Sequence, residues 1–400
     1  MAIKVLWFPG NGSIYANTNI YNGGGWTSAL AYAIKSKSNI ELGMAIPWNN
    51  YFKESKNDVI FYGIPPIRHG IFRYNKKLDL QINTMKSIVD DFKPDIIHVF
   101  GSEHTGGMVA TVTNIPVVLH IQGILNMWAE TWLPQNMSWE KFMTFHPRQW
   151  FHKRTLYRAC KTELTILKSC HNYMGRTEMD SRVSSLLSIN RKYYYCSEML
   201  RPIIYNSKKT WQPHYCHNKK IIISIISPPI YKGGDIILRT AKTLKNYTNL
   251  NFEWYVFGIK NLRDWESLTG IEHKSVNVKI GGIISAEELV NNVINADVYV
   301  HPSYIENSPN TICETQLLGI PVIACYVGGT PTLVNHNETG ILVPSNDIYQ
   351  TASYINELCI DTNKAIYLGR NAREKALKRH DPNTIVTDLL NIYKDILNND

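Results

Sequence analysis

Apolar residues in the second half of the chain form short continuous runs, and segments with helical spacing separate these runs. A continuous run of four to eight apolar residues is typical of a buried strand, whereas apolar residues three and four apart indicate one face of a helix. Ser285 and Glu288 have the spacing of a capping box before one of these helices. The pattern predicts strands at 221–226, 252–258 and 276–282, and helices at 236–244 and 285–296.

The segment 296–334 continues this alternation. A strand is predicted at 297–300, followed by a loop and a helix that begins near Asn310 and stops at Gly319, with Pro321 leading into the next strand. Strands that alternate with helices predict a parallel sheet, and ligands of such sheets bind beyond the carboxyl ends of the strands. Glu306 lies in the loop after the strand at 297–300, so it is expected at the edge of the sheet where the carboxyl ends of the strands lie.

The predicted helix start near Asn310 has the features of an anion site. Ser308, Asn310 and Thr311 lie where backbone N–H groups have no partner within the helix, so they are candidates for binding a phosphate or diphosphate. Glu314, one turn further on, can accept two hydrogen bonds from a vicinal diol such as a ribose. Glu306 can reach a second group, such as a sugar hydroxyl. Together these residues predict a nucleotide-sugar site.

Taken singly, each glutamate would be read as a solvated loop residue or a carboxylate near a helix dipole. The order of the whole segment favours the site. Glu306 and Glu314, the following strand entry LLGIPV and the pair Gly328-Gly329 resemble the donor-binding signature of retaining glycosyltransferases of family 4. The resemblance implies that Glu314 binds the nucleotide ribose and that Glu306 lies near the transferred sugar. The link 307–311 departs from the glycine-rich link usual in that family.

A turn follows the predicted strand at 221–226, and it contains Lys232 and Gly233. Lys232 can stabilise charge on a leaving diphosphate. Locally, an ordinary surface lysine is an equally good interpretation, but family 4 enzymes carry a similar K-G pair at this turn. They also carry an arginine about six residues earlier, where this chain has Ile226.

The first half shows the same alternation, with strands predicted at 4–8, 94–100, 116–123 and 171–174. The loop after the first strand ends in a glycine run that includes Gly24 and Gly25, and such a run before a helix can bind an anion or allow a close-packed turn. Its position resembles the family's N-terminal glycine loop, which faces the donor phosphates. Both glycines are therefore candidate substrate-binding residues.

Three polar residues lie near the ends of the predicted N-terminal strands. A lone histidine in an apolar strand is more often a core residue than a catalyst. Resemblance nevertheless assigns His120 a place close to the reacting sugar, with His104 as a weaker candidate. Arg176 follows the strand at 171–174 and is expected to contact the acceptor or to close the domains.

Residues 124–161 are rich in tryptophan, phenylalanine, lysine and arginine. Such a segment could bind a sugar acceptor by stacking or lie on the anionic surface of the inner membrane. Equally, it could be a helical hairpin whose aromatic side chains pack on the N-terminal domain. The net charge of +9 and pI near 9.0 favour anionic surfaces in general. Nucleic acid is not predicted as a partner, because no basic patch accompanies a recognition motif.

Composition is consistent with a two-domain globular protein. A chain of 400 residues is too long for one ordinary core, and 44% hydrophobic with 19% charged residues excludes a disordered chain. No apolar run is long enough to span a bilayer, and the N-terminal residues read as a strand rather than a signal peptide, so a cytoplasmic location is expected. The seven scattered cysteines suggest neither disulfides nor a zinc site.

The sequence therefore predicts an α/β protein of the GT-B fold, with two Rossmann-like domains whose parallel sheets face each other across a cleft. Its expected activity is retaining transfer of a sugar from a nucleotide-diphosphate sugar to a glycan or lipid-linked acceptor, in surface polysaccharide synthesis and without a metal or other cofactor. The alternatives are a nucleotide-sugar epimerase or a non-catalytic sugar-binding scaffold; two catalytic carboxylates would not need a phosphate-type helix start, which disfavours a glycosidase. The expected parts are an acceptor-binding domain over 1–205, a donor-binding domain over 206–378 and a returning helix over 379–400.

Overall fold

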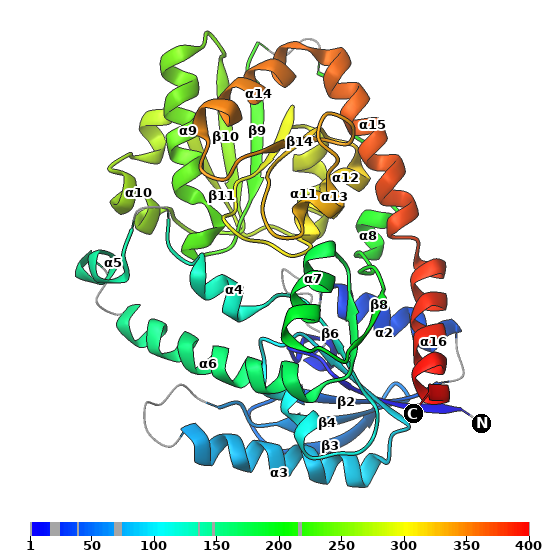
Figure 1. Cartoon of the computed structure of the whole chain (residues 1–400). Coiled ribbons are helices and arrows are strands. Elements are labelled where there is room, and N and C mark those ends of the chain that lie inside the picture. The colour runs from blue at the N-terminus through cyan, green and yellow to red at the C-terminus, as the bar shows by residue number, and fades with distance from the viewer. Residues whose placement is uncertain are drawn as a thin grey trace.

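A computed structural model describes residues 2–16, 25–37, 40–67, 74–134, 137–145, 149–214 and 218–399. It has two α/β domains, each built around one sheet, and Figure 1 shows them stacked one above the other. Within the described ranges, every helix is too short or too polar to span a bilayer. The expected fold class of two facing Rossmann-like domains is confirmed.

The N-terminal sheet has eight strands in the order β3-β4-β2-β1-β5-β6-β7-β8. Neighbouring strands are parallel except β3 and β4, which form an antiparallel hairpin at one edge. Hydrophobic side chains occupy almost every position of the central strands, as expected for a sheet covered on both faces. The strands are β1 (Ile3–Phe8), β2 (Ile40–Pro47), β3 (Phe52–Lys56), β4 (Val59–Ile64), β5 (Ile96–Phe100), β6 (Val117–His120), β7 (Asn172–Gly175) and β8 (Lys192–Tyr195).

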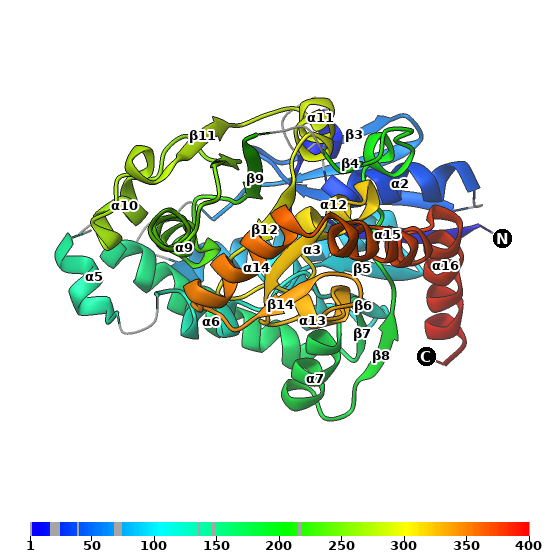
Figure 2. The same cartoon turned by 90° about the horizontal axis from the view of Figure 1, so that it is seen from above.

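Helices cover both faces of this sheet, and Figure 2 shows the molecule from above. The longest, α6, packs against the short 3₁₀ helix η1 and against α4. The helices of this part are α1 (Ser13–Ala16), α2 (Gly25–Lys37), α3 (Tyr74–Phe92), η1 (Thr105–Thr111), α4 (Leu125–Glu130), α5 (Trp139–Phe145), α6 (Gln149–Ser169), α7 (Glu178–Leu187) and α8 (Pro202–Tyr205).

The C-terminal sheet has six strands, all parallel, in the order β11-β10-β9-β12-β13-β14. The predicted strands and helices of this half are present with small shifts at their ends, and Ser285 and Glu288 form the expected capping box. The strands are β9 (Lys220–Ile225), β10 (Phe252–Phe257), β11 (Val278–Gly282), β12 (Val298–His301), β13 (Val322–Cys325) and β14 (Ile341–Val343).

The last helix returns to the N-terminal domain, as Figure 1 shows in red. Its apolar face joins the core of the N-terminal sheet, and the Tyr393 hydroxyl accepts a hydrogen bond from Trp7 Nε1 at 3.0 Å. The helices of the second half are η2 (Ile230–Lys232), α9 (Gly234–Tyr247), α10 (Arg263–Thr269), η3 (His273–Val276), α11 (Ala286–Ile294), α12 (Asn310–Leu318), α13 (Thr330–Leu333), α14 (Ile348–Ile360), α15 (Thr362–Arg379) and α16 (Pro382–Asn399).

The aromatic segment 124–161 does not pack on the N-terminal domain alone, which corrects that part of the prediction. The ring of Trp128 stacks on the ring of Tyr231 in the C-terminal domain, with 5.8 Å between the ring centroids. The ring of Trp132 also contacts Tyr231. Phe142 is buried in the C-terminal core. The segment is hydrophobic because it crosses between the domains and covers part of the second core.

Candidate functional site

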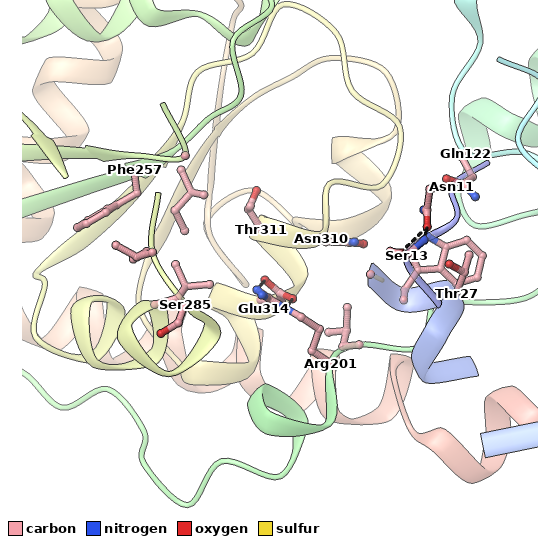
Figure 3. Close-up of a pocket in the computed structure, with 17 residues that line it drawn as sticks. Asn11, Ser13, Thr27, Gln122, Arg201, Phe257, Ser285, Asn310, Thr311 and Glu314 are labelled. Carbon is pink, nitrogen blue, oxygen red and sulfur yellow. Dashed lines mark hydrogen bonds and ion pairs between the residues drawn. The ribbon is translucent and has the colours of Figure 1, made fainter. Parts of the chain in front are cut away.

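A pocket of about 490 Å³ lies between the domains, and residues of both domains line it (Figure 3). Its C-terminal wall includes Ile225 and Phe257, at the ends of β9 and β10, and the start of α12 after β12. The strand order reverses between β9 and β12, so this wall is the topological switch point of the sheet. Open parallel sheets bind their ligands at this place.

Helix α12 directs its N-terminus toward this pocket. Its N-cap residue is Pro309, whose side chain makes no capping hydrogen bond. Asn310 and Thr311 line the pocket, and the buried Oδ1 atom of Asn310 has no hydrogen-bond partner among the described residues. A helix start without a capping side chain leaves N–H groups available to an anion.

Glu314 lies on α12 and is held by Arg201, from the segment that joins the domains. Arg201 donates from Nε to Oε1 and from Nη2 to Oε2 of Glu314, both at 2.7 Å. This two-pronged contact fixes the orientation of the carboxylate, and Glu314 is only 3% exposed. Because a carboxylate has about four acceptor sites, two remain for a ligand in the pocket that both residues line.

Glu306 and Lys232 form a buried ion pair beside the pocket rather than in its lining. Lys232 Nζ lies 2.6 Å from Glu306 Oε1, and His301 Nε2 lies 3.2 Å from the same oxygen. Burial alone would raise the pKa of Glu306, but the charge of Lys232 and the contact with His301 outweigh it and lower the pKa to about 2. Glu306 is therefore ionised at neutral pH.

Glycines allow the loops of this region to approach closely. A Cβ atom at Gly233 would overlap the carbonyl oxygen of Pro302, and one at Gly328 would overlap the carbonyl oxygen of Glu306. Gly233 has φ 77° and Gly328 has φ 50°, which other residues rarely adopt. The predicted K-G and G-G turns thus fix the backbone on either side of the ion pair.

The N-terminal wall of the pocket is formed by the loop after β1, the start of α2 and the loop after β6. Gly25, the first residue of α2, lines the pocket with φ 63°, whereas Gly24 lies outside the described residues. Asn11, Thr27 and Gln122 face the pocket from the same side (Figure 3). The pocket therefore contains polar groups from both domains.

His120 does not line the pocket, contrary to the role expected for it. It is fully buried, its Nδ1 lies 3.3 Å from His98 Nε2, and its ring packs against Trp26. Burial lowers the pKa of His120 well below its ordinary value, so it is neutral. The side chain of His120 lies in the core of the N-terminal domain. Gln122, two residues further along the chain, lines the pocket instead.

Ser308 and Arg176 lie in a buried network between the domains, and neither lines the pocket. The Ser308 hydroxyl donates to Glu198 Oε1 at 2.7 Å, and Arg176 Nε lies 3.8 Å from Glu198 Oε2. Arg379 Nη2 lies 3.7 Å from the same Oε2. Burial would raise the pKa of Glu198, but the charges of Arg379 and Arg176 lower it below its usual range.

One group of possible metal-ligating side chains comes together in the described ranges, namely Glu198, Cys313 and His380. The guanidinium groups of Arg176 and Arg379 already neutralise the carboxylate of this group. Burial also raises the pKa of the Cys313 thiol well above its ordinary value, so the thiolate that a metal prefers is disfavoured. These residues do not fit a cation site.

Sequence reasoning missed Arg201 and Gln122 as parts of the site. Arg201 lies 113 positions before Glu314 in the sequence, and only the packing of the joining segment on α12 brings the two together. The sequence offers one signal for Gln122, which is its position near the end of a predicted strand.

Residues 208–375 match the family described as "Glycosyl transferases group 1". Among curated proteins, a D-inositol 3-phosphate glycosyltransferase of Corynebacterium kroppenstedtii is 32% identical over 173 residues. This alignment covers 42% of the present chain and 38% of that relative, so the similarity is limited to part of each protein.

Solved structures resemble the whole chain. Sucrose-phosphate synthase from Thermosynechococcus elongatus has a TM-score of 0.73 and 16% identity, with 100% of both chains covered. Anabaena HepE in complex with UDP and glucose has a TM-score of 0.65 and 14% identity, over 97% of this chain and 98% of that one. At these identities the likeness shows the fold alone, which is the GT-B fold.

Proposed function

We propose that this protein is a retaining glycosyltransferase that uses a nucleotide-diphosphate sugar as donor. The observation that carries the proposal is the pocket in which Glu314, oriented by Arg201, lies one turn inside a helix whose N-terminus has no capping side chain. The match of residues 208–375 to a glycosyltransferase family covers the C-terminal wall of this pocket. HepE, a neighbour in fold, was determined with UDP and glucose, which supports a nucleotide-sugar donor.

In this proposal the nucleotide lies along the C-terminal wall of the pocket. Phe257 and Leu289 supply an apolar surface for the base. Glu314 accepts hydrogen bonds from the two ribose hydroxyls, and the start of α12 at Asn310 and Thr311 binds the diphosphate. The sugar then extends toward Glu306 and Lys232.

Transfer requires that the bond between the anomeric carbon and the diphosphate oxygen breaks while the acceptor hydroxyl oxygen bonds to that carbon. For retention, the acceptor approaches on the face that the diphosphate leaves, and its proton passes to a diphosphate oxygen. Lys232 stabilises the charge of the leaving diphosphate, and Glu306 keeps Lys232 in place and contacts the sugar. We propose that this charge stabilisation needs no metal, which activity in excess EDTA would test.

The acceptor in this proposal is a hydroxyl of a glycan or of a lipid-linked sugar, and the pathway is surface polysaccharide synthesis. The side chain of Tyr157 is exposed on α6, with Lys153 Nζ 6.0 Å from the centroid of its ring, and a peripheral membrane contact is proposed at this surface. Binding to vesicles with and without anionic lipid tests this contact separately from catalysis.

The test is a transfer assay with UDP-, GDP- and ADP-linked glucose, galactose, mannose and N-acetylglucosamine, each with a panel of glycoside acceptors. We expect release of one nucleoside diphosphate, and a product whose anomeric proton coupling in NMR matches the donor configuration. An inverted product would contradict retention. Interconversion of the donor without acceptor would identify an epimerase, and donor binding without any turnover would identify a scaffold.

A further inference from the structure

A second pocket, of about 270 Å³, lies within the N-terminal domain and is separate from the donor pocket. It is lined by residues at the ends of β1, β4 and β5, among them Phe8, Ile64 and Phe100. β1 and β5 are neighbours in the sheet, yet the chain passes from β1 to β2 on the other side, so this is the switch point of the N-terminal sheet. Each domain thus has a pocket where its topology predicts a ligand.

Glu103 lines this second pocket from the loop after β5. Its Oε2 atom is buried and has no hydrogen-bond partner among the described residues. Two glycines make space for the carboxyl group: a Cβ atom at Gly101 would overlap Oε2, and one at Gly123 would lie 2.9 Å from Oε1. A buried polar atom without a partner is rare and costly, and it needs an explanation.

Unlike Oε2 of Glu103, the carboxylate of the neighbouring Glu163 has several hydrogen-bond partners. Glu163 accepts hydrogen bonds from Ser102 Oγ and from the backbone N–H groups of Leu125 and Asn126. Burial and the charge of Glu163 raise the pKa of Glu103 to about 8, although Arg176 acts in the opposite direction.

A second atom in the pocket lacks a partner. Gln81 lies on α3, is only 8% exposed and donates from Nε2 to the carbonyl oxygen of Pro65 at 2.9 Å. Its Oε1 atom is buried and has no partner among the described residues. Gln81 and Glu103 come from different elements, so two independent oxygens at this pocket are available to hydroxyl groups of a ligand.

We propose that this pocket binds one uncharged sugar ring of the acceptor, and that Glu103 and Gln81 accept hydrogen bonds from its hydroxyls. This inference rests on the proposed transferase function. The apolar side chains of Phe8, Met85 and Phe100 suit the C–H face of a sugar ring. The volume lies just below the roughly 300 Å³ at which pockets for drug-sized ligands begin, which limits the ligand to about one ring. A buried carboxyl group also disfavours an anionic ring.

The experiment measures binding of the methyl glycosides of glucose, galactose, mannose and N-acetylglucosamine by saturation-transfer difference NMR, alongside UDP, GDP and ADP. At least one glycoside is expected to bind wild type, and Glu103→Ala is expected to weaken it at least tenfold. Glu103→Gln should retain most of the binding, because a neutral amide resembles the carboxyl group held protonated at neutral pH. Glu130→Ala, at an exposed position of α4, is the matched control and should bind as wild type.

Folding stability separates a ligand-binding residue from a structural one. Because the buried Oε2 atom of Glu103 has no partner among the described residues, its replacement should not destabilise the protein, so Glu103→Gln is expected to melt at or above the wild-type temperature. Ala159→Phe provides an independent variant, because this half-buried residue on α6 lines the pocket and a larger side chain there would fill it. It should abolish glycoside binding and leave nucleotide binding unchanged.

Three results would overturn the inference: no glycoside binds wild type, binding survives in Glu103→Ala, or Glu103→Gln lowers the melting temperature by more than a few degrees. Failure of the proposed function has a different signature, which is the absence of binding by all three nucleotides. Glycoside binding that depends on Glu103, seen without any nucleotide binding, would support the pocket and contradict the transferase.

Discussion

Glu314 combines a fixed orientation with free acceptor sites, and this combination depends on Arg201. The bidentate contact at 2.7 Å keeps the carboxylate directed into the pocket. The sequence identified Glu314 as a candidate ribose ligand but not its partner, because Arg201 is remote in sequence and carries no motif. His120 shows the opposite case: the family resemblance suggested a site residue, whereas the structure buries its side chain in the core beside Trp26 and His98.

Glu314→Ala is expected to weaken nucleotide binding by about 10- to 100-fold, since each lost hydrogen bond to a charged group contributes roughly 1.5–3 kcal/mol. Isothermal titration of the preferred nucleoside diphosphate measures this change. Glu287→Ala, at an exposed position of α11, is the control and should bind normally. Equal affinities for the three proteins would remove Glu314 from the site.

Lys232→Ala should lower the turnover rate by about 10²- to 10³-fold, because it removes charge stabilisation of the leaving diphosphate. It should also destabilise the protein by about 3 kcal/mol, since it leaves Glu306 buried without its partner. The double variant Lys232→Met/Glu306→Gln is expected to regain stability but not turnover. Recovery of turnover in the double variant would contradict the assignment.

The Lys232–Glu306 pair also predicts a dependence of stability on pH. The pKa of Glu306 is lowered to about 2 in the folded protein from an ordinary value of 4.5. The unfolded chain therefore binds this proton first, so the stabilisation is present above pH 4.5 and is lost as the pH falls toward 2. Urea unfolding between pH 7 and pH 3 should show a shallower loss of stability for the double variant than for wild type; parallel curves would contradict the pair's contribution.

At the scale of elements, the pattern of apolar residues predicted the buried strands well and the edge of the N-terminal sheet poorly. In β1, β5, β6, β9 and β10, apolar residues occupy all but one or two positions, and this pattern is typical of buried strands. β3, with the sequence FKESK, is an exposed edge strand. Charged residues protect such an edge from pairing with other chains, but they also remove the apolar signal of a strand.

Lys232 is the last residue of η2, and Gly233 joins η2 to α9. The backbone conformation of Gly233 therefore helps to set the position of Lys232. Gly233→Ala should lower stability by about 1–3 kcal/mol, because φ 77° is unfavourable for alanine and its Cβ would overlap Pro302. Gly270→Ala is a matched control, since Gly270 also has positive φ, at 67°, but no atom lies within 4 Å of its added Cβ. Chemical denaturation of both variants should show the larger loss at Gly233, and equal losses would contradict the steric argument.

At the scale of the whole molecule, Glu198 connects the domains. It faces Arg176 of the N-terminal domain, Arg379 at the end of α15 and the Ser308 hydroxyl before α12. Thr177 adds a direct contact, donating to Asn307 Oδ1 at 2.6 Å. The sequence could suggest two domains, but it could not predict this network, since its members are spread over about half of the chain and only the docking of the domains brings them together.

Glu198→Gln should destabilise this docking, because it leaves two buried guanidinium groups without a counter-charge, at a cost of about 3–5 kcal/mol. Scanning calorimetry is expected to show a lower melting temperature and a separation of the two domain transitions. Glu272→Gln, at an exposed position before η3, is the control and should melt as wild type. A single unshifted transition in Glu198→Gln would contradict the role of the network.

The central claim is that the pocket between the domains binds a nucleoside diphosphate through Glu314 and the start of α12. Isothermal titration of UDP, GDP and ADP into wild type and Glu314→Ala tests it most directly. We predict saturable binding of one nucleotide at a single site, weakened at least tenfold by the substitution. Absence of binding by all three nucleotides, or an affinity unchanged in Glu314→Ala, would contradict the claim.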